Sequence, residues 1–260
     1  MDDIRKRIDY KTLTELTEQW DNICESREEI IEQGLDVSLM YVTSPCVLEE
    51  VKKENPKTIL DVGCGTGYLT ACLSQYAPTI GIDCSKKSID IANNKYSKKG
   101  LCFLHNSIES YSPTQYFDLC TANMVFSCDP NWKKSLVKIH KMLSANGCIL
   151  IVLPHPCFWP QNWGILNKEW FDYKEEMFIE HDFSITFAKS LGTSTYIHRP
   201  FENYINGCIE SGFSIEKIKE PYPVISMPDG YQYKFPRFFM IKARKHSVII
   251  AKSKLGNKFS

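Results

Sequence analysis

Residues 58–68 read Thr58-Ile59-Leu60-Asp61-Val62-Gly63-Cys64-Gly65-Thr66-Gly67-Tyr68. This segment predicts a buried strand that runs directly into a turn with glycine at alternate positions, followed by a helix. The glycines let the backbone pass where a Cβ atom would collide, so a ligand can lie against main-chain atoms at the carboxyl end of the strand. The segment is therefore the first candidate for a binding site.

Apolar runs and helical patterns alternate after this turn. Strands are predicted at 58–62, 79–82, 101–105, 117–122, 148–153, 213–218 and 238–243, and helices at 68–75, 85–96, 132–143 and 201–209. Short, continuously apolar strands separated by helices are typical of a mostly parallel sheet that helices cover on both faces. We therefore expect an α/β, doubly wound fold with a seven-stranded sheet.

The chain divides into four parts by pattern. Residues 1–54 predict a helical leader, with apolar residues at helical spacing from Tyr10 to Ile23 and a second helix that begins at Ser44 and Pro45. Residues 55–153 form the binding core, and 201–260 hold the remainder of the core and a tail. Between them, 154–200 is rich in aromatic residues and irregular, which favours a lid or substrate cap inserted after the fifth strand.

Composition narrows the function classes. The 260 residues include 31 basic and 31 acidic side chains, and this balance disfavours nucleic acid as a partner. The longest apolar run, Cys148 to Leu153, is too short to cross a bilayer. The 11 cysteines include no C-x-x-C pair, which indicates reduced thiols in a cytoplasmic protein. No Asp, His or Glu cluster stands at metal-ligand spacing, so we expect no metal.

A carboxylate follows the second predicted strand. Asp83 comes 16 residues after Gly67, where an acidic side chain can accept hydrogen bonds from both hydroxyls of a ribose. A dinucleotide fingerprint requires a third glycine, but the corresponding positions hold Tyr68 and Thr70. The spacing therefore indicates a nucleoside-containing cofactor and weakens a diphosphate interpretation.

The segment Asp61-Val62-Gly63-Cys64-Gly65-Thr66-Gly67 resembles motif I of the class I S-adenosylmethionine-dependent methyltransferases, whose pattern is Asp-x-Gly-x-Gly-x-Gly. The resemblance extends over roughly residues 55–245. It implies a Rossmann-like methyltransferase fold in which the last, antiparallel strand lies between the fifth and the sixth. It also implies S-adenosyl-L-methionine as the cofactor and S-adenosyl-L-homocysteine as the product.

The resemblance assigns cofactor contacts residue by residue. The turn and Asp61 would hold the methionine portion, Asp83 the ribose, and Cys84 and Ile108 the adenine. The family often has Asp where Ser107 stands, and Asn123 ends the strand that passes beneath the methyl donor. The implied cofactor-binding residues are Asp61, Gly63, Cys64, Gly65, Thr66, Gly67, Asp83, Cys84, Ser107, Ile108 and Asn123.

Candidates for the acceptor side lie near the predicted lid. His155 follows the fifth strand by two residues and suits a catalytic base, although two flanking prolines equally suit a histidine that shapes a turn. His198 and Arg199 precede the helix after the lid and could bind the acceptor; Arg199 could instead form a salt bridge or cap that helix. Trp20 and Tyr41 in the leader could close over the cofactor.

We therefore expect a cytoplasmic enzyme that methylates a small-molecule acceptor at oxygen, nitrogen or carbon. One alternative is an NAD(P)-dependent oxidoreductase, which the glycine spacing disfavours. Another is a catalytically inactive S-adenosylmethionine-binding regulatory protein, and a third keeps the reaction with RNA or protein as acceptor. The pattern leaves the acceptor and the oligomeric state open.

Overall fold

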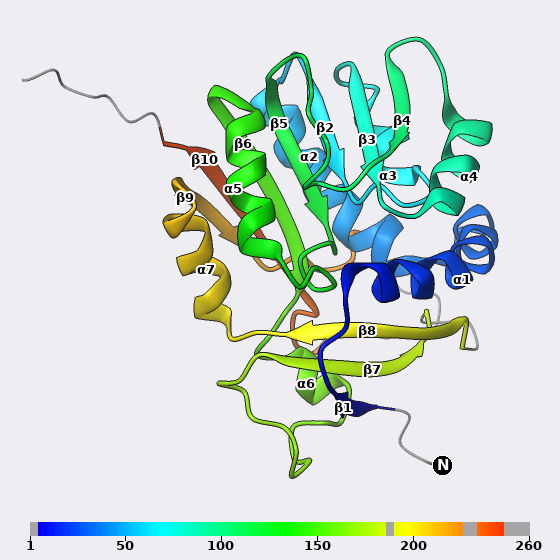
Figure 1. The fold of residues 1–260 in the computed structure, drawn as a ribbon, viewed down its shortest axis with the longest axis vertical. Coiled ribbons are helices and arrows are strands. Elements are labelled where there is room, and N and C mark those ends of the chain that lie inside the picture. The colour runs from blue at the N-terminus through cyan, green and yellow to red at the C-terminus, as the bar shows by residue number, and fades with distance from the viewer. Residues whose placement is uncertain (1–4, 186–189, 226–232, 247–260) are drawn as a thin grey trace, which may run out of the picture.

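The computed structural model describes residues 5–185, 190–225 and 233–246. A seven-stranded sheet in the order β4-β3-β2-β5-β6-β10-β9 forms its centre (Figure 1). The strands are β2 (Ile59–Val62), β3 (Thr79–Asp83), β4 (Leu101–His105), β5 (Phe117–Asn123), β6 (Leu143–Pro154), β9 (Phe213–Lys219) and β10 (Phe238–Lys245). The strands β2 to β6 are parallel, whereas β10 is antiparallel to both of its neighbours. The seven predicted strands and the place of the antiparallel strand are confirmed.

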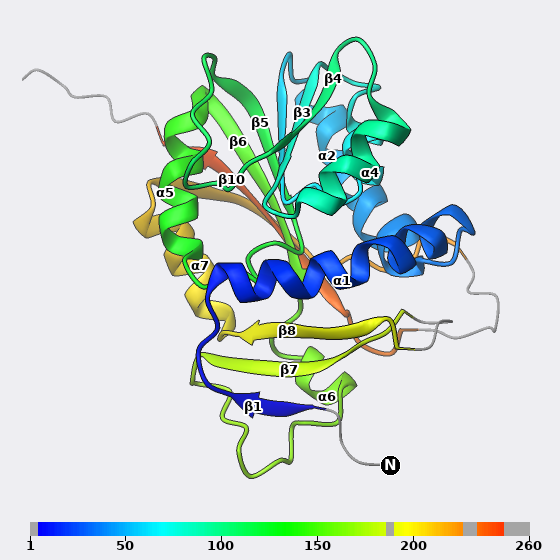
Figure 2. The same ribbon diagram turned by 45° about the vertical axis from the view of Figure 1, so that its right-hand side comes forward.

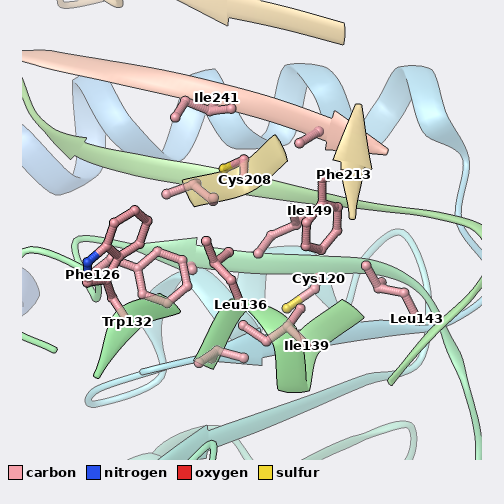
Figure 3. Close-up of a cluster of buried hydrophobic side chains, with 14 of the residues drawn as sticks. Cys120, Phe126, Trp132, Leu136, Ile139, Leu143, Ile149, Cys208, Phe213 and Ile241 are labelled. Atoms are coloured by element: carbon pink, nitrogen blue, oxygen red, sulfur yellow. The ribbon is translucent and has the colours of Figure 1, made fainter. Parts of the chain in front are cut away.

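Helices cover both faces of this sheet. One face packs against α2 (Ser44–Glu54), α3 (Tyr68–Leu73) and α4 (Lys86–Tyr96), and the other against α5 (Trp132–Met142) and α7 (Phe201–Glu210). On the second face, Leu136 and Ile139 of α5 pack in one cluster with Cys120 and Ile149 of the sheet (Figure 3). Because both faces are buried, the strands carry apolar residues continuously.

A second sheet of three antiparallel strands lies near the carboxyl edge of the first (Figures 1 and 2). It consists of β1 (Lys6–Ile8), β7 (Met177–Phe183) and β8 (Gly192–His198), with β7 in the middle. The segment predicted to be irregular therefore contains a hairpin, and the leader predicted to be helical adds a strand to it. Sequence periodicity did not show this, because β1 and β7 pair across some 170 positions of the chain.

Several aromatic residues of segment 154–200 pack in a core of their own. Around the buried side chains of Ile165, Met177, Ile179 and Tyr196 pack Trp159, Trp163, Trp170 and Phe171. The short helix α6 (Trp159–Asn162) contributes the first of these rings. This core gives the small sheet its own apolar support.

The leader helix α1 (Leu13–Glu32) begins with a capping box. The hydroxyl of Thr12 accepts the N–H of Glu15 at 3.3 Å, and the Glu15 carboxylate accepts the N–H of Thr12 at 2.7 Å. Tyr10 lies outside the helix, with its ring 5.2 Å from that of Phe178. The π-helix η1 (Ser38–Thr43) then leads into α2. Within the described residues, no helix has the length and apolar character needed to span a membrane.

Candidate active site

The glycine turn between β2 and α3 forms an open backbone cradle. Gly63, Gly65 and Gly67 have φ angles of +64°, +55° and +94°, which only glycine adopts readily. A Cβ atom on Gly63 would lie 2.4 Å from a methyl carbon of Val125, and one on Gly67 would lie 2.9 Å from the Phe103 ring. A Cβ atom on Gly65 would meet no atom within 4 Å. Gly65 is thus the place where a ligand can approach the main chain.

Asp83 borders the cradle at the end of β3. Its Oδ2 atom accepts the N–H of Gly65 at 2.8 Å, and its Oδ1 atom accepts the N–H of Ser85 at 2.8 Å. A carboxylate oxygen has a second lone pair, so both oxygens can still accept hydroxyl groups of a ligand. Burial raises the pKa of Asp83, and the two N–H donors offset part of that rise.

A pocket that is partly open to solvent lies at the carboxyl ends of β2, β3, β4 and β5. The glycine turn, the loops after β3, β4 and β5, and α1 all line it. Figure 2 shows α1 running across the carboxyl ends of these strands. Between β4 and β5 the lining residues are Asn106, Ser107, Ile108 and Glu109; after β5 they are Met124, Val125, Cys128 and Asp129. Ligand sites of open α/β sheets occupy this same edge.

Eight of the eleven predicted cofactor-binding residues line this pocket: Gly63, Gly65, Thr66, Asp83, Cys84, Ser107, Ile108 and Asn123. Asp61, Cys64 and Gly67 are absent from the lining. The carboxylate oxygens of Asp61 accept the hydroxyls of Thr70 and Thr121, both at 2.6 Å, and burial raises its pKa to about 6. Cys64 is buried in the cluster under α4. Asp61 and Cys64 thus contact the protein interior, and Gly67 lies close to the Phe103 ring.

Asn123 brings an unpaired polar atom to the pocket. Its side-chain N–H group donates to the hydroxyl of Thr43 at 3.3 Å. Its carbonyl oxygen is buried and accepts no hydrogen bond from the described residues. It is one of eleven buried side-chain polar atoms without a hydrogen-bond partner among the described residues, and the one that belongs to a residue of the pocket lining.

His155 lies outside the pocket lining. Its ring is 3% exposed, with Nε2 2.8 Å from a carboxylate oxygen of Glu220 and Nδ1 accepting the N–H of Cys157 at 3.3 Å. It stacks on Phe201 with the ring centres 6.0 Å apart. Burial lowers the pKa of His155, and Glu220 opposes that effect. These contacts hold the chain in place after β6. They agree with the alternative that His155 shapes a turn.

His198 and Arg199 are also absent from the lining. His198 donates to a main-chain carbonyl of the inserted segment at 3.0 Å. Arg199 is 0% exposed and donates to Glu176 at 2.6 Å and to the carbonyls of Phe126 and Asp129 at 2.6 and 2.9 Å. Arg199 thus ties the small sheet to the loop after β5.

Most of the α1 contribution to the pocket was not expected from the sequence. One stripe of the helix lines it: Leu13, Leu16, Thr17, Trp20, Cys24 and Arg27. Trp20 and Tyr41 were expected to close over the cofactor; Trp20 lines the pocket, whereas Tyr41 does not. The helical spacing of the stripe was visible, but spacing alone does not tell whether a helix face meets a core or a cavity. Asp129 and Ser135, which also line the pocket, carried no sequence signal.

The chain matches a family model described as a methyltransferase domain over residues 53–193. This range contains the glycine turn, Asp83 and every pocket-lining segment except α1. The chain belongs to the methyltransferase domain family. The sequence-based expectation of a class I S-adenosylmethionine-dependent methyltransferase is confirmed by this family match and by the seven-stranded fold.

This methyltransferase is similar to an uncharacterized protein of Haemophilus influenzae, with 27% identity over 225 residues that cover 78% of this chain and 87% of that protein. It is also similar to a malonyl-[acyl-carrier protein] O-methyltransferase of Halalkalibacterium halodurans, with 31% identity over 106 residues, 38% of this chain and 39% of that enzyme. A crystal structure of a S-adenosylmethionine-dependent methyltransferase from Clostridium acetobutylicum has a TM-score of 0.60 at 16% identity and covers 87% of this chain and 99% of that one. The second match spans less than half of either chain, and the third shows the fold.

Proposed function

We propose that this methyltransferase transfers the methyl group of S-adenosylmethionine to a small-molecule acceptor held in the pocket beneath α1. One observation carries the proposal: the open Gly65 position, the Asp83 carboxylate and the unpaired Asn123 oxygen border a single pocket. These are a main-chain surface, an acceptor for hydroxyls and an acceptor for an N–H group. Together they suit an adenosyl amino acid.

The pocket residues fit the cofactor in chemistry and in charge. Asp83 would accept the ribose hydroxyls, Cys84 and Ile108 would contact the adenine, and Asn123 would accept an N–H donor of the methionine portion. The carboxylates of Asp83, Glu109 and Asp129 border the pocket and favour a cationic sulfonium. When bound, the cofactor supplies the electrophilic methyl group.

Apolar side chains support a small acceptor. Leu13, Leu16 and Trp20 on α1 line the same pocket as Met124 and Val125. Such walls exclude water and hold an acceptor in line with a methyl donor. Because α1 covers the pocket, RNA or protein acceptors fit this site less well. The atom that is methylated stays open among oxygen, nitrogen and carbon.

We further propose that the protein acts in the cytoplasm and needs no metal. The balanced charge and the cysteines without disulfides support the location. Across the described ranges, no group of three or more His, Cys, Asp or Glu side chains could hold a metal ion. The proposed reaction is a displacement that requires alignment rather than a Lewis acid.

Replacing Asp83 with Ala tests the cofactor assignment. Loss of the ribose hydrogen bonds should weaken the binding of S-adenosylhomocysteine by about 1–3 kcal/mol, as measured by isothermal titration calorimetry. Asp83→Asn keeps the size of the side chain and removes its negative charge, so its affinity for S-adenosylhomocysteine shows how much of the effect is due to the charge. Asp90→Ala on the exposed side of α4 is the matched control, since Asp90 pairs with Lys86 at 2.6 Å and does not line the pocket.

Unchanged affinity of Asp83→Ala for S-adenosylhomocysteine would count against the proposed site. Binding of NAD or NADP in its place would favour an oxidoreductase. Tight cofactor binding without turnover of any acceptor in a broad library would favour the inactive regulatory alternative.

A further inference from the structure

Arg27 lies on the face of α1 that covers the pocket, about one turn after Cys24. Among the lining residues in the described part of the chain, it is the only Lys, Arg or His. The other charged side chains there are the carboxylates of Asp83, Glu109 and Asp129. An anionic group on a bound ligand therefore meets repulsion at three places and attraction at Arg27 alone.

Asp36 holds one edge of the Arg27 guanidinium. The Nε and Nη2 atoms donate to Oδ2 of Asp36 at 3.2 and 3.1 Å, and the other oxygen of Asp36 accepts the N–H of Leu39 at 3.0 Å. Asp36 itself is 3% exposed. The Phe183 ring lies 6.0 Å from the guanidinium carbon, within range of a cation–π contact. Arg27 is thus positioned before any ligand binds.

The other edge of the guanidinium is available to a ligand. In residues 5–185, 190–225 and 233–246, no hydrogen bond engages the Nη1 atom of Arg27, and 27% of the side chain is exposed. A guanidinium presents five N–H donors in a planar fork, and two of them match the oxygens of a carboxylate. Asp36 occupies the edge formed by Nε and Nη2. The two N–H groups of Nη1 and the second N–H group of Nη2 therefore have no hydrogen-bond acceptor among the described residues.

We propose that Arg27 is the anion-binding residue of this pocket and takes a carboxylate of the bound ligand. This inference rests on the proposed function and adds to it a residue outside motif I. The carboxylate has two possible sources, the amino-acid end of S-adenosylmethionine or an acidic acceptor. In either case the ligand ties α1 to the sheet, because its other groups contact the glycine turn and Asp83.

The test compares ligands that differ only in the carboxylate. Calorimetry measures the affinity for S-adenosylmethionine and for its decarboxylated form, S-adenosyl-3-methylthiopropylamine. A second pair, phenylacetate and phenylacetamide, is titrated into protein saturated with S-adenosylhomocysteine. Each pair is measured with the full-length wild type, with the double variant Arg27→Gln, Asp36→Asn, and with Arg27→Lys.

The double variant removes the cation without leaving the buried Asp36 charge unpaired, and its melting temperature checks the fold. Arg7→Gln is the matched control, because Arg7 on β1 pairs with Glu175 at 2.8 Å on the surface. Arg27→Lys keeps the charge and loses the fork, so it should show an intermediate preference.

The wild type should bind S-adenosylmethionine at least tenfold more tightly than the decarboxylated form. If this ratio falls to twofold or less in the double variant, Arg27 binds the carboxylate of the cofactor. If the wild type binds phenylacetate more tightly than phenylacetamide and the double variant does not, Arg27 binds a carboxylate of the acceptor. Preferences that are the same in both proteins, or missing in the wild type, overturn the inference and leave Arg27 as a fastening of α1 to Asp36. A wild type that binds neither adenosyl compound overturns the proposed function itself.

Discussion

At the scale of single residues, Gly63 and Gly65 differ in what surrounds them, so the same substitution should affect stability at one and ligand binding at the other. Gly63→Ala places a Cβ atom 2.4 Å from Val125 at a φ of +64°, so the free energy of unfolding should fall by about 2–4 kcal/mol. Gly65→Ala meets no neighbour and should lose about 1–2 kcal/mol from backbone strain alone. It should nevertheless weaken S-adenosylhomocysteine binding at least tenfold. Urea unfolding and calorimetry of both variants would contradict this if stability fell equally and Gly65→Ala bound normally.

His181 predicts a pH dependence of stability. It lies against the Trp163 ring at 4.3 Å, donates from Nδ1 to the carbonyl of Asp182 and accepts the Ser194 hydroxyl at Nε2. Burial lowers its pKa to about 4, so between pH 6.5 and 4 the unfolded chain binds the extra proton. Stability contributed by neutral His181 is complete above pH 6.5 and is lost as the pH falls.

From pH 7.5 to pH 5, this linkage should remove about 2 kcal/mol of unfolding free energy from the wild type. His181→Gln should lose that much less over the same interval, as urea denaturation at the two pH values would show. His155 and His198 also have a lowered pKa, but they are present in both proteins and cancel in the comparison. Equal pH slopes would contradict the assignment.

At the scale of elements, a buried charge joins α2 to β9 and β10. Glu50 is 0% exposed and pairs with Lys53 at 3.0 Å, with Lys217 at 2.9 Å and more distantly with Lys242 at 3.6 Å. Burial by itself raises the pKa of Glu50, but the lysines outweigh it and the net pKa is lowered. Glu50→Gln should therefore cost about 3–5 kcal/mol of unfolding free energy.

The neighbouring Glu49 is the matched control for Glu50. It pairs with Lys53 and Lys219 from a side chain that is 49% exposed, and solvent screens such pairs. Glu49→Gln should change the free energy of unfolding by less than about 1 kcal/mol. If both variants lost the same free energy of unfolding, burial of Glu50 would not be the reason why its ion pairs stabilise the fold.

At the scale of the whole molecule, the N-terminal segment connects the two sheets. β1 pairs with β7, α1 crosses the pocket, and α2 packs on the main sheet (Figure 2). S-adenosylhomocysteine at about 100 times its Kd should add about 2.7 kcal/mol of stability and raise the melting temperature by about 5–10 °C. NADH at the same concentration should leave it unchanged.

Hydrogen exchange locates that stabilisation. The amides of α1 should exchange more slowly with ligand bound, and by a larger factor than those of α7, which does not line the pocket. Equal protection of the two helices would show that α1 does not close on the ligand.

Several features could be predicted from the residues because they depend on neighbours in the chain. The run of Thr58 to Tyr68 determined the strand, the turn and the family resemblance, since glycine conformations and apolar runs are local properties. Asp83 followed from its place at a strand end, because parallel strands end at one edge. The same logic brought Ser107, Ile108 and Asn123 to the pocket.

Only the tertiary structure showed that α1 lines the pocket and which contacts His155, His198 and Arg199 make. His155, His198 and Arg199 stand where the acceptor was expected in the sequence, yet their partners lie in segments distant along the chain. In the sequence, Arg27 is one charged residue of an amphipathic helix. The structure shows that it lines the pocket and that Asp36 lies beside it. Periodicity records that a side chain is on a face, whereas what that face meets depends on contacts between segments remote in sequence.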